Sequence, residues 1–426
     1  MKRIPVTVAP AGFIVFLVIL LLSSCSEDGR NILNREKLFS LEYGKMEDQV
    51  DLYQDPGVPF SSKTRLYMRE GIFFIANGNS NKIMEFTSYG DILSLYYNAD
   101  HNPDTFLLQR DEEERESANR KAYTYPFQEV GEVAVNSEKE VLVEDKVGES
   151  RSEFDPEIGA MLNRVVLRFD KEGELLDYIG QEGVGGTPFP FIHNIHVTER
   201  DEIAVVTRSV KHWVVFWYSP RGALLYKLNL SVDNLPVPEN EKLVPSLSEV
   251  TVDQEERLVY LKIEYYGSGE GSLQGRTGSG SELRNIDYDR SLIWFFDIQD
   301  ERFTGNVEVP VKEGREKLSD FKEAENVRRI YDHIGTGTGG TFFLLAPHDN
   351  DIFELLLLKR SGKVIARQNI EIPEKGIHYR DMHVTPKGVL TALFAKDEEV
   401  DIVLWRSDKL MEDEDEDSST VGDGGD

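Results

Sequence analysis

A short unit recurs along this chain: an apolar run, an aromatic residue or Leu, three polar residues, Gly, and a second apolar run. Four copies pair Phe86 with Gly90, Phe169 with Gly173, Tyr218 with Gly222 and Leu358 with Gly362, and a further copy has Asp300 in place of the Gly. Gly supplies the positive φ that a tight turn between two strands requires. Each copy, with the β-rich runs beside it, therefore predicts a four-stranded antiparallel sheet with strands a to d.

Six such copies lie between residues 64 and 406. A single sheet cannot bury two apolar faces, whereas sheets stacked radially can, so the repeat predicts an all-β, six-bladed β-propeller. The sixth copy lacks a d strand, because the sequence turns polar and acidic from Ser407. We expect the segment 37–53, which precedes the first blade, to fill that place and close the ring.

The N-terminus has the layout of an export signal. Lys2 and Arg3 precede a ten-residue apolar run, Phe13 to Leu22, which is about half the roughly 20 residues of a membrane-spanning helix. The following "LSSC" resembles the lipobox of bacterial lipoproteins. That resemblance implies removal of residues 1–24, a diacylglycerol and an acyl chain on Cys25, and a place in the bacterial cell envelope, on the periplasmic face or the outer surface. The alternative is an ordinary secretory signal followed by an incidental Cys.

The stretch "VVLRFDKEGELLDYIGQEGVGGTPFPFIHNIHVTERDEIAVV" has the rhythm of strand, Gly turn, strand and Gly-rich linker that is typical of NHL repeats. The chain thus resembles the NHL-like six-bladed propellers and, with the lipobox, an uncharacterised group of spirochaete lipoproteins. The predicted organisation is a signal peptide over 1–24, a lipidated tether over 25–36, the propeller over 37–408 and an acidic disordered tail over 409–426.

Charge and cysteine content exclude several classes of function. Lys and Arg number 48 against 77 Asp and Glu, a net charge of −29, and a chain this acidic does not suit nucleic acid. Contact with the membrane is expected through the lipid anchor only. Cys25 is the single cysteine, so internal disulfides and thiolate zinc sites are excluded.

The longest interruptions of the repeat fall at two kinds of position. Segments 98–128, 231–246 and 310–328 connect strand d to the next strand a, and segments 148–162 and 267–289 connect b to c. Because strands alternate in direction, both kinds of connection belong to one face. We expect that face to bind an envelope protein or a glycan, although the insertions could instead be merely tolerated loops.

Two sets of side chains are candidates for a site. Tyr125, Phe127, Phe189 and Phe191 lie at crossovers between blades and predict either an aromatic binding rim or a plug between blades. His196, His333 and His383 are expected at equivalent positions of strand a, which lines the central channel.

Those three imidazoles could converge on a divalent metal, or be core histidines bonded to backbone. His193, three residues before His196, is expected on the opposite side of its strand. The sequence therefore favours a binding or scaffold module with no cofactor besides the lipid. The alternative is a metal-assisted, lactonase-like or esterase-like hydrolase at the channel.

Overall fold

The computed structural model describes residues 32–53, 62–106, 120–239, 241–268, 286–316 and 325–411. The predicted signal peptide, Cys25 and the tail from residue 412 lie outside these ranges. The chain divides into two compact units, Met1–Ile32 and Leu33–Asp426, and the second contains every strand named below. No helix among the described residues is long and apolar enough to cross a membrane.

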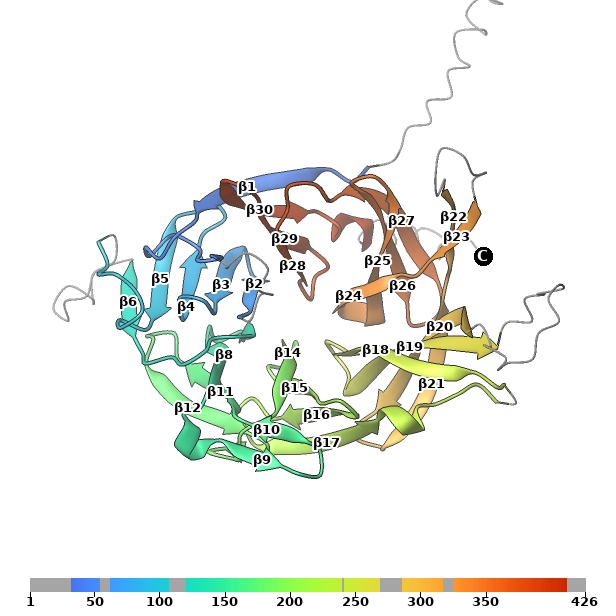
Figure 1. Cartoon of the computed structure of the whole chain (residues 1–426), viewed down its shortest axis with the longest axis horizontal. Coiled ribbons are helices and arrows are strands. Elements are labelled where there is room, and N and C mark those ends of the chain that lie inside the picture. The colour runs from blue at the N-terminus through green and yellow to red at the C-terminus, as the bar shows by residue number, and fades with distance from the viewer. Residues whose placement is uncertain are drawn as a thin grey trace, which may run out of the picture. The chain divides into compact units, whose positions relative to one another are not determined.

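In the second unit, six antiparallel sheets follow one another around a ring (Figure 1). Blade 1 consists of β2 (Thr64–Arg69), β3 (Ile72–Asn77), β4 (Lys82–Phe86) and β5 (Ile92–Tyr97). Blade 2 consists of β7 (Val133–Val135), β8 (Val141–Lys146), β11 (Arg164–Phe169) and β12 (Leu175–Gly180). Blade 3 consists of β14 (Phe191–Val197), β15 (Ile203–Arg208), β16 (His212–Tyr218) and β17 (Leu224–Ser231). The predicted six-bladed propeller is confirmed.

The second half of the ring repeats this order. Blade 4 consists of β18 (Val244–Val252), β19 (Leu258–Ser268), β20 (Ile286–Asp297) and β21 (Arg302–Val309). Blade 5 consists of β24 (Asp332–Gly337), β25 (Thr341–Asp349), β26 (Ile352–Lys359) and β27 (Val364–Glu371). Blade 6 takes β28 (Tyr379–Val384), β29 (Leu390–Ala395) and β30 (Glu399–Trp405) from the C-terminal end, and its fourth strand is β1 (Arg35–Glu42).

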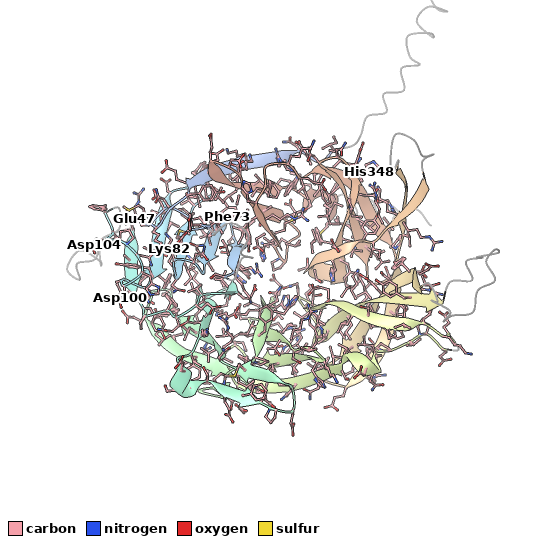
Figure 2. All side chains as sticks on the ribbon, viewed as in Figure 1. Glu47, Phe73, Lys82, Asp100, Asp104 and His348 are labelled. Carbon is pink, nitrogen blue, oxygen red and sulfur yellow. The ribbon has the colours of Figure 1, made fainter. Side chains whose placement is uncertain are left out.

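The ring closes through β1, which pairs antiparallel with β30 from Arg35 opposite Trp405 to Glu42 opposite Glu399. The predicted ring-closing strand is therefore confirmed, although it starts two residues before 37 and ends at Glu42. The chain then folds onto blade 1, where the fully buried Lys82 (Figure 2) donates a hydrogen bond to the Met46 carbonyl at 2.6 Å. Burial lowers the pKa of Lys82 to about 7.

Apolar side chains fill the spaces between neighbouring blades. Phe73, for example, lies in a cluster shared by blades 1 and 6, and Trp217 lies in a cluster shared by blades 3 and 4. The predicted turns have the expected backbone: φ is positive at Gly90, Gly173, Gly222 and Gly362. In blade 4 the positive φ falls on Glu301, one residue after Asp300.

The long interruptions lie at the predicted b–c and d–a positions and carry small elements of their own. These are β6 (Lys121–Thr124), which pairs parallel to β5, the hairpins β9 (Glu153–Asp155) with β10 (Ala160–Leu162) and β22 (Lys312–Glu316) with β23 (Glu325–Arg329), and the 3-10 turns η1 (Glu149–Arg151) and η2 (Val232–Asn234). Elsewhere, the two-residue β13 (Gly183–Val184) lies in the connection from β12 to β14, and the 3-10 turn η3 (Thr338–Gly340) lies in the a–b turn of blade 5. At the other end of the chain, Leu410 and Met411 still pack against a cluster of blades 5 and 6.

Candidate functional site

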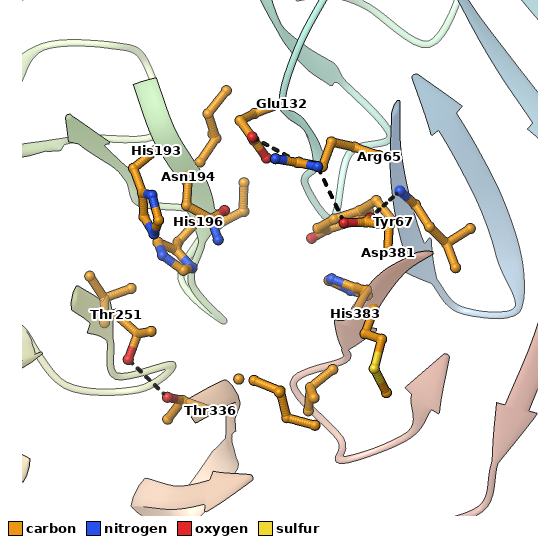
Figure 3. A pocket seen from close by; sticks show the side chains of 18 of the residues that line it. Arg65, Tyr67, Glu132, His193, Asn194, His196, Thr251, Thr336, Asp381 and His383 are labelled. Atoms are coloured by element: carbon orange, nitrogen blue, oxygen red, sulfur yellow. Dashed lines mark hydrogen bonds and ion pairs between the residues drawn. The ribbon is translucent and has the colours of Figure 1, made fainter. Parts of the chain in front are cut away.

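A cavity of about 270 Å³ lies in the channel at the centre of the ring (Figure 3). Residues at or beside strand a of all six blades line it, among them Arg65, Glu132, His193, Glu249, Thr336 and Asp381. The volume lies just under the roughly 300–1,000 Å³ that is typical of sites for drug-sized ligands. The cavity therefore suits one small ligand or the end of a larger one.

A β-bulge places more side chains in the cavity than strand alternation predicts. In β14 the register shifts between Ile192 and Asn194, so one extra residue, His193, is inserted opposite β15. His193 and His196 consequently both line the cavity, and the expectation that they face opposite sides was wrong. Because a bulge re-aims the side chains around it, sequence spacing alone misses this arrangement. Similar shifts occur in β18, between Leu247 and Glu249, and in β24, between His333 and Gly335.

The three predicted histidines all line this cavity, but they are not equivalent. In the pairing of strand a with strand b, His196 lies opposite Ala204 and His383 lies opposite Thr391. Each is the last pair but one before the a–b turn of its blade. His333 lies before the bulge of β24, opposite Leu344 and farther from the a–b turn. Among the described residues no group of three or more His, Cys, Asp or Glu could hold a metal ion. The side chains present thus do not fit the metal centre that the sequence suggested.

The protein keeps these imidazoles neutral. Burial lowers the pKa of His196, of His333 and of His383 to about 4. His333 Nε2 lies 3.0 Å from the Gly335 carbonyl, and His383 is bonded to the backbone of Met68. Both rings are thereby held by one nitrogen, as in the core-histidine alternative, while the other nitrogen is buried without a protein partner among the described residues.

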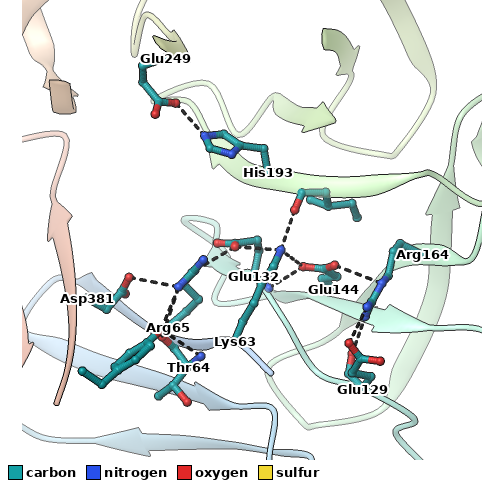
Figure 4. Close-up of polar contacts among 12 residues, drawn as sticks. Lys63, Thr64, Arg65, Glu129, Glu132, Glu144, Arg164, His193, Glu249 and Asp381 are labelled. Atoms are coloured by element: carbon teal, nitrogen blue, oxygen red, sulfur yellow. Dashed lines mark hydrogen bonds and ion pairs between the residues drawn. The ribbon is translucent and has the colours of Figure 1, made fainter. Parts of the chain in front are cut away.

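Charged groups near the start of the inner strands form a network across three blades (Figure 4). Arg65 Nε lies 2.8 Å from Glu132, and Arg65 Nη1 lies 3.4 Å from Asp381. Lys63 Nζ lies 3.0 Å from Glu132 and 2.7 Å from Glu144. These cations and carboxylates therefore compensate one another.

The two carboxyls that Arg65 holds have their pKa values shifted in opposite directions. Burial raises the pKa of Asp381 to about 7, although Arg65 and the Leu66 amide oppose the shift. For Glu132 burial acts in the same direction, but the charges of Lys63 and Arg65 outweigh it and the pKa is lowered. Asp381 consequently exchanges protons near neutral pH, whereas Glu132 stays ionised.

A histidine–carboxylate pair stands on the other side of the cavity. His193 Nε2 lies 2.9 Å from Glu249 Oε1, and the imidazole meets Trp213 edge to face at 4.8 Å. Burial opposes ionisation of Glu249, but the hydrogen bond and charge of His193 outweigh it and lower the pKa. The pair fixes the orientation of His193 in the channel wall.

The four predicted aromatic residues are divided between two environments. Phe127 and Phe189 are fully buried, and Tyr125 is half-buried with its ring 4.7 Å from that of Phe127. These three belong to the apolar cluster between blades 1, 2 and 3, where a plug would lie. Phe191 is 49 % exposed, and Lys63 Nζ lies 4.3 Å from the centre of its ring. Of the four, only Phe191 has the exposure that a rim requires.

Sequence reasoning missed Arg65, Glu132, Asp381 and Glu249 as cavity residues. A signal for them was present, because each lies in or beside the first strand of a copy, as in "TRLYM", "GEVAV" and "YRDMH". Their partners, however, lie in other blades, and spacing within one copy does not predict such contacts.

Comparisons with known proteins support no assignment beyond the fold class. No family model and no curated protein matches the chain. Similar solved structures include a lignostilbene dioxygenase of Pseudomonas brassicacearum, with 12 % identity over 82 % of this chain and 70 % of that chain and a TM-score of 0.36. Another is regucalcin, a calcium-binding protein from Agrobacterium tumefaciens, with 10 % identity, coverage of 80 % and 88 %, and a TM-score of 0.36. A protein of unknown function from Bacteroides caccae has 10 % identity, coverage of 79 % and 94 %, and a TM-score of 0.34. Similarity at this level carries no argument about activity.

Proposed function

We propose that this chain is a lipid-anchored envelope protein whose propeller binds a ligand, with a polar end of that ligand in the central channel. The observation that carries the proposal is the cavity lined from all six blades, whose wall is polar, with Arg65 held between Glu132 and Asp381 and His193 held by Glu249. A site of this kind can hold a polar group in a fixed orientation. The long b–c and d–a connections would then supply further contacts around the ligand.

A glycan fits this site better than a protein surface does. The cavity of about 270 Å³ admits a small group and no folded element, and polar side chains supply hydrogen-bonding groups at many points of its wall. The alternative, a metal-assisted hydrolase at the channel, has less support, because no group of three or more His, Cys, Asp or Glu in the described part of the chain could hold a metal ion. We therefore propose a binding role, with an envelope glycan as the partner.

Binding to glycans released from isolated cell envelopes tests the proposal. Asn194 lines the cavity and is partly exposed, so Asn194→Phe should narrow the channel without disturbing the core. We expect this variant to lose at least tenfold in affinity, whereas Tyr89→Phe, in the exposed turn between the outer strands β4 and β5 of blade 1, should bind as the parent does. Equal binding by both variants, or binding only to detergent-extracted envelope proteins, would place the ligand elsewhere.

The anchor is tested separately. Cells fed a radiolabelled fatty acid should label the parent chain and not a Cys25→Ser variant, and the variant should leave the membrane fraction. Labelling of the variant would show that Cys25 is not the attachment point.

A further inference from the structure

A second cavity, of about 510 Å³, lies where the chain leaves the closing strand β1 and passes blade 6. Its walls come from the segment after β1, from the start of β28 and from the loop between β29 and β30, which all belong to the face with the long connections. The volume is within the roughly 300–1,000 Å³ that is typical of small-molecule sites. We call this cavity the closure cleft, and its lining includes Tyr43, Tyr53, His378, Tyr379, Lys396 and Asp397.

Three tyrosine rings line the closure cleft, and two of them are fixed through their hydroxyl groups. Tyr43 donates a hydrogen bond to the Lys396 carbonyl, and Tyr379 donates one to the Thr64 carbonyl at 2.6 Å. Both side chains are half-buried and pack against the apolar cluster shared by blades 1 and 6. Tyr53, by contrast, is 78 % exposed. The cleft thus combines two rigid rings with a third that is open to a ligand.

Most charged groups at this end of blade 6 compensate one another. Lys396 pairs with Asp401, and Asp401 also lies 2.7 Å from Lys37. Lys37 in turn lies 2.8 Å from Glu399. Two cations therefore face two carboxylates in this group and leave no net charge.

Asp397 is the cleft carboxylate that remains. Its side chain is 78 % exposed, and Oδ1 lies 2.6 Å from His378 Nε2, which offsets the charge only when the imidazole is protonated. The other cleft carboxylate, Asp51, has Lys45 at 3.8 Å. The field of Asp397 extends to Tyr43, since burial and, next in size, the charge of Asp397 raise the pKa of Tyr43 to about 12. An open carboxylate therefore stands beside the aromatic rings.

This combination suits a cation that needs few hydrogen bonds. An aromatic ring attracts a cation placed over its face, and several rings around one space recognise methylated ammonium groups. A quaternary ammonium group has no N–H to satisfy, whereas a primary ammonium has three. The hydroxyl groups of Tyr43 and Tyr379 already donate to carbonyls, so the cleft offers less to a sugar. An anion would be repelled by Asp397.

We propose that the closure cleft binds a small organic cation of the quaternary ammonium class, held by the rings of Tyr43, Tyr53 and Tyr379 and by the carboxylate of Asp397. None of these four residues lines the channel cavity. The site therefore goes beyond the proposed function and does not depend on the ligand in the channel. Free choline and the choline headgroup of a lipid present the same chemistry.

Calorimetry on the full chain at pH 8 tests the ligand class with three probes. Choline should bind. Its carbon analogue, in which a tert-butyl group replaces the trimethylammonium group, and ethanolamine, which has the charge without the methyl groups, should each bind at least tenfold more weakly. The comparison uses the unmodified chain, so it does not depend on how a variant folds. No binding of choline, or equal binding of either comparison probe, would overturn the proposal.

Variants at exposed positions test the assigned contacts. Asp397→Asn and Tyr53→Ala should each reduce the affinity for choline at least threefold, and Tyr53→Phe, which keeps the ring, should recover most of the loss. Glu398→Gln removes the neighbouring exposed carboxylate, which does not line the cleft, and Tyr89→Ala removes an exposed ring on the opposite face. Both should stay within twofold of the parent. Parental affinity in Asp397→Asn or in Tyr53→Ala would overturn the assignment.

Vesicles distinguish the two sources of the cation. The Cys25→Ser chain, which lacks the expected anchor, is sedimented with phosphatidylcholine or phosphatidylglycerol vesicles. Sedimentation with phosphatidylcholine alone, reversed by free choline, assigns the cleft to a lipid headgroup, and binding of choline without sedimentation assigns it to a free cation. Sedimentation with phosphatidylcholine that choline does not reverse would contradict a shared site. Failure of the chain to bind envelope glycans would overturn the proposed function and leave these results unaffected.

Discussion

Arg65 of blade 1 and Asp381 of blade 6 form an ion pair, with Arg65 Nη1 3.4 Å from Asp381 Oδ1, across the junction where the two ends of the chain meet. A second carboxylate, Glu132 of blade 2, holds Arg65 Nε at 2.8 Å. One guanidinium thus joins the first, second and last blades on the channel side. The outer side of the same junction is held by β1 on β30.

Removing Arg65 should destabilise the ring. Arg65→Met leaves Asp381 largely buried without its cation, whereas Glu132 keeps Lys63 at 3.0 Å, and breaking a buried pair typically costs about 3–5 kcal/mol. Urea unfolding should show a loss of that order. Arg302→Met removes an exposed pair with Asp300 and should change stability by less than about 1 kcal/mol. Equal losses in the two variants would show that the junction does not depend on Arg65.

The closing strand β1 should contribute as much to the stability of the fold as any core strand. Phe39 of β1 is buried, with its ring 5.8 Å from Phe73 and 5.6 Å from Phe86. Phe39→Ala should lower the free energy of unfolding by about 3–5 kcal/mol. Glu36→Ala, at an exposed position of the same strand, should stay within about 0.5 kcal/mol of the parent. A small effect of Phe39→Ala would mean that β1 is dispensable for closure.

Two turn glycines have nearly the same φ but differ in the contacts that an added Cβ would make. Ala substitutions at these two positions therefore distinguish backbone strain from steric contact. Gly173 has φ +84° and Gly362 has φ +87°, so Ala at either position meets a backbone cost of about 1–2 kcal/mol. A Cβ on Gly173 would also lie 2.3 Å from the Tyr123 ring, whereas one on Gly362 would meet Val307 at 3.7 Å. Gly173→Ala should therefore be the more destabilising in thermal unfolding, and the reverse order would show that the Tyr123 ring moves aside freely.

The residues show why the fold could be predicted and the site only in part. The turn that ends at Gly90 and the missing d strand after Trp405 can each be recognised from a short stretch of sequence. In a closed ring, the first must join two neighbouring strands of a blade and the second must be replaced by a strand from the other end of the chain. The equivalence of His196 and His383 follows from the repeat in the same way. His333 departs from it because β24 contains a bulge, and a single inserted residue has no sequence signature here. The pairing of Arg65 with Asp381, 316 positions apart, depends on closure of the whole ring.

Stability should fall as the pH drops from about 6.5 to about 4, and two substitutions should change that slope in opposite directions. In this window the unfolded chain protonates histidines that the folded protein keeps neutral, because burial lowers the pKa of His196, His333 and His383 to about 4. The unfolded state then binds more protons, so the free energy of unfolding rises with pH. Asp381 acts in the opposite direction, since burial raises its pKa to about 7 and the folded state holds the extra proton.

His383→Leu should therefore flatten the dependence of stability on pH between 4.5 and 6, by up to about 1.4 kcal/mol per pH unit for one proton. Asp381→Asn should steepen it. Urea unfolding at half-unit pH steps measures both slopes against the parent chain. Slopes that change in the same direction in the two variants would show that these groups do not titrate with the perturbed pKa values on which the account of the channel depends.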